Sequence, residues 1–301
     1  MSEGYRASLD GALDAVLTAL VSRNRASLEA ARYTENGVEL PVGEGLWATA
    51  DATGSYRHAI LDADRGEAAC FATVTEGKTR SIMALRVKHD GKAVREIEAM
   101  LARPPLFGGA DAFGDGPGAL DASGAPDPAW FEPIPEAERI DRAELQRIAD
   151  MYFVGLEKND GRGDYPFADD CVRIENGFRV TQVPPAPTAG KTPYQDKLRS
   201  LSAREQFETG FFRFVDRIRE RRFPVIEVSR GTVFSLAFFD HSGTVREYQL
   251  AEGTPATAGI DRPFSWMIAE AFRIERGLIT RIEALMTQVP YGHRSGWDNA
   301  G

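Results

Sequence analysis

Cysteine is scarce in this sequence. The two cysteines, Cys70 and Cys171, are far apart, and neither belongs to a CxxC pair. A disulfide framework and a thiolate zinc site are therefore both poorly supported. With no disulfides expected, we predict a protein of the reducing cytoplasm.

Basic residues are too few for a polyanionic partner. The chain has 36 Lys and Arg against 45 Asp and Glu, a net charge of −9, which repels a nucleic-acid backbone or an anionic membrane surface. No run approaches the roughly 18 apolar residues of a spanning helix. Residues 1–23 have the pattern of an amphipathic helix and not that of a signal peptide. We therefore predict no nucleic-acid partner and no membrane partner.

The motifs of common cofactor enzymes are missing as well. There is no GxGxxG, GxxxxGK[ST] or HExxH sequence, and no nucleophile elbow. The four histidines, His58, His89, His241 and His293, have no metal-ligand spacing, although a fold can assemble a metal site from distant residues. The natural enzymatic interpretation is acid–base catalysis with no cofactor and no metal.

The sequence does contain an internal repeat. Three pairs of segments match in the same order, and the spacing between partners grows along the chain, as in two homologous halves of which the second has longer loops. The pairs are YTENGV at 33–38 with RIENGF at 173–178, DRGE at 64–67 with SRGT at 229–232, and KHDG…REIEAM at 88–100 with IERG…RIEALM at 274–286. The length of 301 residues also suits two domains.

Each half is predicted to be an α+β unit in which a helix precedes several strands. Apolar residues at helical spacing predict helices around 12–20 and 145–156, and alternation between turn signals predicts the strands. The strands lie at 56–62, 67–75, 80–88 and 93–101 in the first half and at 223–228, 232–239, 266–275 and 278–287 in the second. Ser202 and Glu205 form a capping-box signature for an extra helix, which we expect to run to about Arg219.

The predicted domains are residues 1–102 and 139–301, joined by a linker at 103–138. The linker is too rich in Gly, Pro and Asp to form a packed element. Its apolar residues indicate that it lies across a surface, and they are Leu106, Phe107, Phe113, Trp130 and Phe131.

The segments FADDCVRIENG and FRIERGLITRIEALMTQ, after a long helix, resemble the nuclear-transport-factor-2-like superfamily. That superfamily includes SnoaL-like cyclases, ketosteroid isomerase and scytalone dehydratase. The resemblance implies an α+β fold with two tandem cone-shaped, curved antiparallel sheets wrapped on helices, each with an apolar interior, and packed back to back. It says little about chemistry, because the superfamily spans several reactions and plain binding modules.

A narrower resemblance rests on ARYTENGVELPVGEGLW, PFADDCVRIENG, REQFETGFFRFVDRIRERRFPV and VPYGHRSGW. Together they resemble a tandem group that includes cofactor-independent lyases of sphingomonads, which release formaldehyde from lignin-derived diaryl propanediols. This resemblance implies a small hydrophobic aromatic substrate.

Alternation along the first strand of the second half puts Arg173 and Glu175 on one face, and Tyr33 and Glu35 are their equivalents in the first half. If that face lines the interior, Arg173 could stabilise a phenolate or enolate, and Glu175 could hold Arg173 or transfer a proton. The alternative is a structural ion pair. Asn176, which follows them, is more simply part of an Asn-Gly turn.

Tyr152 lies near the end of the long helix, from which ketosteroid isomerase and scytalone dehydratase project tyrosines into their pockets. A phenol there could donate a hydrogen bond to an oxyanion, although Tyr152 also fits the apolar stripe of a core helix. Asp170, beside Asp169, could be a base of raised pKa if buried, or part of a solvated turn.

His58 shares a strand face with Ile60 and Asp62 and suits proton transfer near neutral pH, or else it lies on the surface. His89 and His241 fall at predicted hairpin tips. The C-terminal segment 289–297 concentrates Tyr, His, Arg and Trp, and could be a lid, a contact to the first half or a docked structural tail.

We therefore predict that the second half holds the working pocket and that the first half is its scaffold. The catalytic candidates are Arg173, Tyr152, Glu175, His58 and Asp170, and the substrate-binding candidates are Tyr33, Asn176, Phe211, Phe238, Trp266, Tyr291 and His293. The leading function is a cofactor-independent lyase on an aromatic diol. The alternatives are a dehydratase or isomerase of polyketide or steroid type, and a ligand-binding module without turnover. The oligomeric state stays open, a homo-oligomer included.

Overall fold

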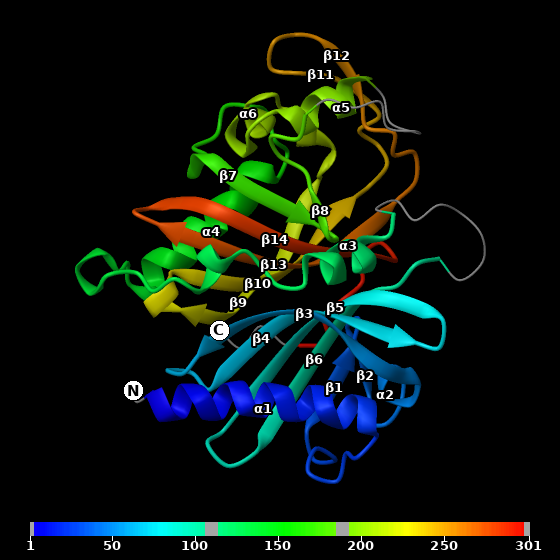
Figure 1. The fold of residues 1–301 in the computed structure, drawn as a ribbon. Coiled ribbons are helices and arrows are strands. Elements are labelled where there is room, and N and C mark those ends of the chain that lie inside the picture. Colours follow the sequence, from blue (N-terminus) through cyan, green and yellow to red (C-terminus); the bar gives the residue numbers. More distant parts are fainter. Residues whose placement is uncertain (1–2, 106–113, 185–192, 298–301) are drawn as a thin grey trace.

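The computed structural model describes residues 3–105, 114–184 and 193–297, and it has an α+β fold in two similar halves (Figure 1). Each half contains one six-stranded sheet. The elements of the first half are α1 (Glu3–Ser22), β1 (Arg32–Glu35), β2 (Val38–Leu40), α2 (Leu46–Thr49), β3 (Ala50–Asp62), β4 (Glu67–Glu76), β5 (Thr79–His89) and β6 (Val94–Ala102).

The second half repeats this plan with additions. Its elements are α4 (Arg142–Leu156), β7 (Phe167–Glu175), β8 (Phe178–Arg179), α5 (Pro193–Ser200), α6 (Ala203–Glu208), β9 (Arg217–Glu227), β10 (Thr232–His241), β13 (Phe264–Glu275) and β14 (Leu278–Val289), and a separate hairpin of β11 (Glu247–Gln249) and β12 (Pro255–Thr257). The strands predicted in both halves are confirmed.

The two sheets have the same strand order. The first is β2-β1-β6-β5-β4-β3 and the second is β8-β7-β14-β13-β10-β9. Neither is wholly antiparallel as expected, because β1 pairs with β6 and β7 pairs with β14 in parallel. Parallel strands need a long connection, which a short hairpin cannot provide. Here the connection is the chain between the two strands of each pair, which contains the other strands of the same sheet.

The extra helix expected to reach Arg219 is shorter. The capping box of Ser202 and Glu205 is present, but α6 ends at Glu208 because Gly210 takes a left-handed conformation. A 3₁₀ helix at Phe211–Phe214 follows, and β9 begins at Arg217. Phe212 and Phe214 therefore pack, partly buried, on the second core from a 3₁₀ turn.

The repeat seen in sequence is also a repeat of hydrogen bonds. Asn36 donates from its backbone to the Ala99 carbonyl and exchanges two side-chain hydrogen bonds with the backbone of Leu101. Asn176 makes the same set with Ala284 and Met286. Both asparagines have positive φ, 46° and 44°. Each Asn-Gly turn thus clamps the first strand of its half to the last.

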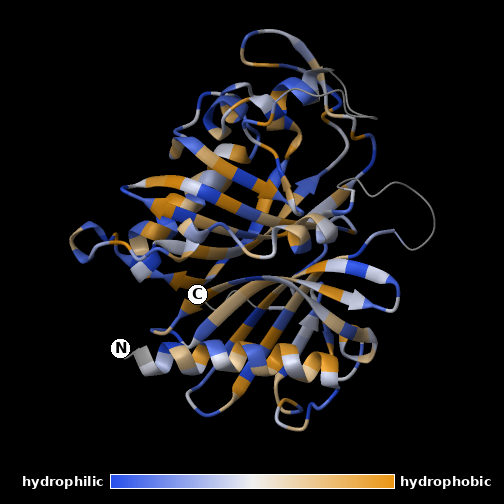
Figure 2. Cartoon of the chain, in the orientation of Figure 1, coloured by the Kyte–Doolittle hydropathy of each residue, from blue (hydrophilic) through white to orange (hydrophobic). Residues whose placement is uncertain are grey.

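Three apolar cores hold the chain together. One lies between α1 and the first sheet, and a second lies among α4, α6 and the second sheet. The third lies between the two sheets, which pack face to face through residues such as Phe71 and Met100 from one and Phe234 and Leu285 from the other. Figure 2 shows apolar residues along the strands of both sheets, with polar residues among them. Strands β4 and β10 are buried along nearly their whole length, because both of their faces meet a core.

The linker is partly a packed element, contrary to expectation. It forms α3 (Gly116–Ser123) and two 3₁₀ helices, at Pro128–Phe131 and Glu136–Glu138. Leu120 and Trp130 are buried in the core between the sheets. Asp115 caps α3 and Gly124 ends it in a left-handed conformation, so local capping compensates for a composition that disfavours a helix. Leu106, Phe107 and Phe113 lie outside the described residues.

Two straps cross between the halves. The linker strap, residues 114–131, contains α3, which lies beside the second sheet in Figure 1. Gly116 packs so closely on Asn176 that a methyl group on Gly116 would collide with the Asn176 carbonyl. The C-terminal strap, residues 290–297, runs from β14 to the first half and packs on Gly37. Each half therefore supports the Asn-Gly turn of the other.

Candidate active site

A row of residues crosses the inner face of the second sheet. The strand register places Glu175 beside Ala284, Ala284 beside Glu270, and Glu270 beside Ser235. Glu270 lies between Ile268 and Phe272, which belong to the core under α4. The row thus carries two carboxyl groups onto the face of the sheet that packs against the second core.

Glu270 is the least compensated acid of this interior. It is 2% exposed, and among the described residues its Oε2 has no hydrogen-bond partner. Burial raises the pKa of Glu270 to about 8, with a hydrogen bond from Tyr152 and the charge of Arg173 opposing the rise and Glu175 adding to it. At neutral pH Glu270 is therefore mainly a neutral acid, and it titrates just above that range.

Tyr152 reaches Glu270 from α4. Its ring is packed against aromatic side chains and is 3% exposed; these are Phe153, Phe167, Phe207 and Phe272. Burial and then the neighbouring Glu270 raise the pKa of Tyr152 well above its usual value. The phenol therefore keeps its proton and acts as a hydrogen-bond donor. The apolar stripe thus placed Tyr152 correctly in the core, and its role as a donor to an oxyanion stays a prediction.

Arg173 and Glu175 share the inner face, as the alternation predicted. The Arg173 Nε lies 3.1 Å from a Glu175 oxygen, and Nη2 donates to Gln206 Oε1 at 2.7 Å. The guanidinium is 4% exposed. Burial lowers the pKa of Arg173, but Glu175, Tyr152 and Glu270 outweigh burial and leave the pKa above its usual value. Arg173 therefore stays a cation inside the fold.

Glu270 and Gln206 are residues of this cluster that sequence reasoning missed. A signal for Glu270 was available, because it is the lone acid in the apolar run SWMIAEAF of a predicted strand. A lone carboxyl on a strand buried on both faces has to enter one core or the other. Gln206 gave no such signal, since in the sequence it is an ordinary polar position of a predicted helix.

His58 lies outside this cluster. It is on β3, between the sheets, where its Nδ1 lies 2.6 Å from Glu283 Oε2 and its ring lies 4.5 Å from that of Trp130. Tyr56 donates to the same Glu283 oxygen at 2.9 Å. Glu283 and Ala284 are neighbours on β14 with opposite orientations, so the second sheet separates His58 from Glu270. The expected face with Ile60 and Asp62 is confirmed, but it faces the other sheet and not a pocket.

Most other candidates also lie away from the cluster. Asp170 is exposed, and the amide of Asn176 is used by the turn described above. Tyr33 is in the first core, and Phe238 is in the core between the sheets, under the Arg219 guanidinium. Phe238 therefore cannot line the second interior, because it projects from the opposite face of β10 to Phe239.

The C-terminal strap reaches the first half, one of the alternatives foreseen. His293 Nε2 lies 2.8 Å from the Asn36 carbonyl, and Trp297 donates to Thr34 at 2.9 Å. The guanidinium groups of Arg32 and Arg86 lie over the Trp297 ring. Tyr291 is 46% exposed. The strap thus fastens the two halves to each other.

Phe211, Trp266 and His241 lie toward one end of the second half. Trp266 packs partly buried on the second core, and Phe211 lies 5.5 Å from the Tyr194 ring. His241, expected at an exposed hairpin tip, is buried at the end of β10 and stacks on Phe264 with ring centroids 4.6 Å apart. Strand β10 is longer than expected, which carries His241 into the sheet.

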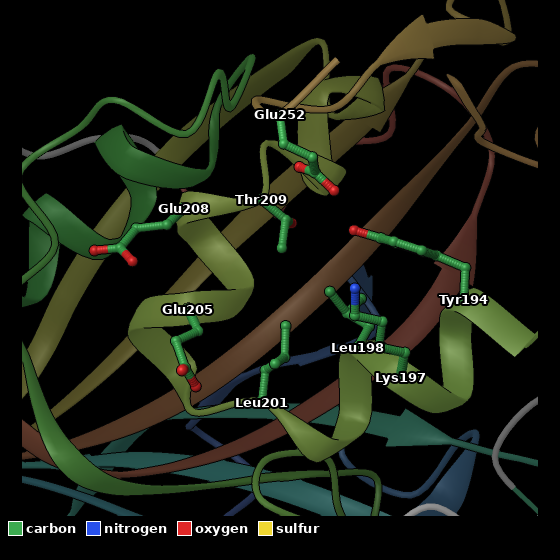
Figure 3. Close-up of a pocket in the computed structure, with 8 residues that line it drawn as sticks. All are labelled: Tyr194, Lys197, Leu198, Leu201, Glu205, Glu208, Thr209 and Glu252. Atoms are coloured by element: carbon green, nitrogen blue, oxygen red, sulfur yellow. The ribbon is translucent and has the colours of Figure 1, made fainter. Parts of the chain in front are cut away.

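A surface cleft of about 270 Å³ lies between α5, α6 and the turn after β11 (Figure 3). It is lined by Tyr194, Lys197, Leu198, Leu201, Glu205, Glu208, Thr209 and Glu252. Gln206 lies on the same helix as Glu205 and Glu208 but is buried behind them. The cleft is thus one helix away from Arg173.

Residues 138–286 match a protein-family model described as a domain of unknown function (DUF8021). The match covers the second half and stops before the C-terminal strap. No curated protein matches the sequence. Within the described ranges no helix is long and apolar enough to cross a membrane. Nor do the described His, Cys, Asp and Glu residues form a group of three or more that could hold a metal ion.

Proposed function

We propose that the second half is a cofactor-independent acid–base enzyme, with its site around Glu270, Tyr152 and Arg173 inside a cone-shaped, nuclear-transport-factor-2-like sheet. The observation that carries the proposal is Glu270, a buried carboxyl with one unpartnered oxygen and a pKa of about 8. Keeping such a group costs stability, and groups of this kind cluster at sites that transfer protons.

The reaction we propose is the lyase reaction on a hydrophobic aromatic diol. Neutral Glu270 protonates the benzylic hydroxyl, which leaves as water, while Glu175 takes the proton of the para-phenol and a quinone methide forms. Glu270, now a carboxylate, then takes the proton of the primary hydroxyl. The carbon–carbon bond breaks, its electrons restore the aromatic ring as a phenolate, and formaldehyde leaves. Glu175 returns its proton to that phenolate.

The remaining groups stabilise the charge that this sequence creates. Arg173 is a buried cation that suits the phenolate, and Glu175, 3.1 Å from its Nε, holds it in place. Tyr152 donates to the Glu270 carboxyl and favours its carboxylate form after the first proton transfer. The surrounding phenylalanine rings supply an apolar lining for an aromatic substrate.

The test is turnover of a diaryl propanediol by the wild type, E270Q and E283Q, with formaldehyde quantified by trapping and products identified by mass spectrometry. E283Q is the matched control, because Glu283 is also a buried acid of the second sheet but faces the other way. We expect E270Q to lose at least about 100-fold in turnover, the scale of removing one catalytic donor, and folded E283Q to keep its activity.

The other outcomes identify the alternative functions. Loss of water without formaldehyde, from this diol or from a polyketide or steroid substrate, would make the protein a dehydratase or isomerase. A diol that binds and is recovered unchanged would make it a binding module. A folded E270Q variant with unaltered turnover would remove the site from this cluster.

A further inference from the structure

Gln206 connects the buried cluster to the surface cleft. Its Oε1 accepts from Arg173 Nη2 at 2.7 Å, and its Nε2 donates to the carbonyls of Val180 at 2.7 Å and Leu198 at 2.9 Å. Leu198 is itself a wall of the cleft. We infer that Gln206 is the positioning residue for Arg173: its amide holds the guanidinium at one end and the backbone beside the cleft at the other.

Gln206 is held rigidly enough to position a neighbour. It is 1% exposed, and α6 is fixed at its start by the capping box of Ser202 and Glu205. At the other end, Thr209 Oγ1 donates to the Gln206 carbonyl at 2.6 Å. The side-chain amide of Gln206 therefore makes its hydrogen bonds to Arg173 and to backbone carbonyls, and not to solvent.

Arg173 needs such support, because little else fixes its guanidinium. Its backbone is held by a hydrogen bond to Thr181 Oγ1. The side chain has Glu175 near Nε, yet Nε makes no well-aligned hydrogen bond among the described residues. The Phe212 ring, 5.5 Å from the guanidinium carbon, gives a weak further contact. The Gln206 hydrogen bond is thus the best-defined contact of the cationic group.

Because the amide of Gln206 is neutral, it also preserves the electrostatic effect of Arg173 on Glu270. A carboxylate there would pair with Arg173 and use its charge, whereas an amide accepts the same hydrogen bond and leaves that charge to act on Glu270. Arg173 favours the ionised form of Glu270. Gln206 therefore fixes both the place and the strength of the positive charge next to the proposed proton carrier.

The experiment compares Q206M, Q206E and the control E208Q in the full chain. Glu208 is on the same helix and lines the same cleft, but it is exposed. Two signals are followed in the resting protein: the Arg173 Nε–H resonance by NMR, assigned with R173M, and the pKa of Glu270 by infrared difference spectroscopy against E270Q. Thermal unfolding establishes that each variant is folded.

We expect Q206M to broaden or lose the Arg173 signal, since the guanidinium loses its acceptor. Q206E restores the acceptor, so the Arg173 signal should persist while the added acid raises the pKa of Glu270 by about 1 or more. E208Q should change neither. An unchanged Arg173 signal in folded Q206M, or an equal change in E208Q, would overturn the inference.

The positioning role rests on the proposed function only in taking Arg173 as part of the site. Neither signal requires a substrate. If no aromatic diol is turned over but Q206M still releases Arg173, the positioning role stands and the proposed reaction fails. If turnover is confirmed and Arg173 does not respond to Q206M, the reaction stands and the role of Gln206 fails.

Discussion

The two halves share a strand order but differ in what their interiors hold. In the second half the register aligns Glu270, Ala284 and Glu175. In the first half the same positions are Leu85, Ala99 and Glu35. Tyr33 stands where the second half has Arg173. Among the described residues, a buried core acid with an unpartnered oxygen therefore occurs in the second half and not in the first. One scaffold can thus hold a polar cluster in one copy and an apolar core in the other.

Glu35, the acid at the equivalent position in the first half, is engaged in structural contacts. Glu35 accepts hydrogen bonds from the Tyr33 hydroxyl at 2.8 Å and the Leu46 backbone at 2.6 Å, and it pairs with Arg103 at 2.7 Å. Tyr33 and Trp47 pack edge to face in the interior. The space left there is about 10 Å³, room for no more than a single water molecule. These contacts fit the scaffold role that we propose for the first half.

The largest expected effect is a loss of stability from a change in the first interior that leaves the second interior as it is. Trp47 is 2% exposed and fills the first interior, so W47A should lower the free energy of unfolding by about 3 to 5 kcal/mol, as removal of a buried aromatic ring does. Denaturant unfolding measures this change. The pKa of Glu270 should stay as in the wild type, and a shifted value would mean that the two interiors are coupled.

A second prediction compares the equivalent residues Arg173 and Tyr33 by activity. R173M keeps much of the stem volume and removes the cation, so turnover of the diol should fall by about 100-fold or more. Y33F removes one hydroxyl from the first half and should leave turnover near that of the wild type. Thermal unfolding of both variants controls for loss of fold. A matching loss in Y33F alone would move the site to the first half.

The third prediction uses pH. Burial raises the pKa of Glu270 to about 8, above the usual 4.5 of the unfolded chain, so the wild type should lose stability as pH rises from about 4.5 to 8. E270Q has no proton to lose there. Its advantage in unfolding free energy should therefore grow by about 3 kcal/mol between pH 5 and pH 8. Parallel stability profiles of the two proteins would show that Glu270 is not a perturbed acid.

Local patterns predicted most of this fold but not its register. Alternation and turn dipeptides located the strands, and repeated Asn-Gly segments revealed the two halves. Parallel pairing of β7 with β14 brings together residues more than a hundred positions apart, which no local pattern encodes. The helix expected to reach Arg219 was wrong because phenylalanines at helical spacing also fit a 3₁₀ turn, from which Phe212 and Phe214 pack on the second core.

For the candidate site, the sequence predicted which way several side chains point but not which core each one enters. Period-two alternation put Arg173 with Glu175, and the helical stripe put Tyr152 inside. Glu270 was missed although it is the lone acid of an apolar run. Because both faces of β13 are buried, the run shows no alternation that would say which core the acid enters. His58 showed the reverse problem, since alternation gave its face correctly but could not tell that this face meets the other sheet.

The smallest expected effect concerns the straps. Trp297 donates to Thr34 and stacks under Arg32 and Arg86, at the edge of the first half. W297L keeps an apolar side chain and loses the hydrogen bond and the cation–π contacts, so the free energy of unfolding should fall by about 1 to 2 kcal/mol. The matched change at the linker strap is G116A, whose methyl group would collide with the Asn176 carbonyl, next to Glu175.

If only the second half holds the site, G116A should alter the pKa of Glu270 and W297L should not. Equal changes in both variants would mean that the straps act on the whole molecule and not on the turn that each one covers.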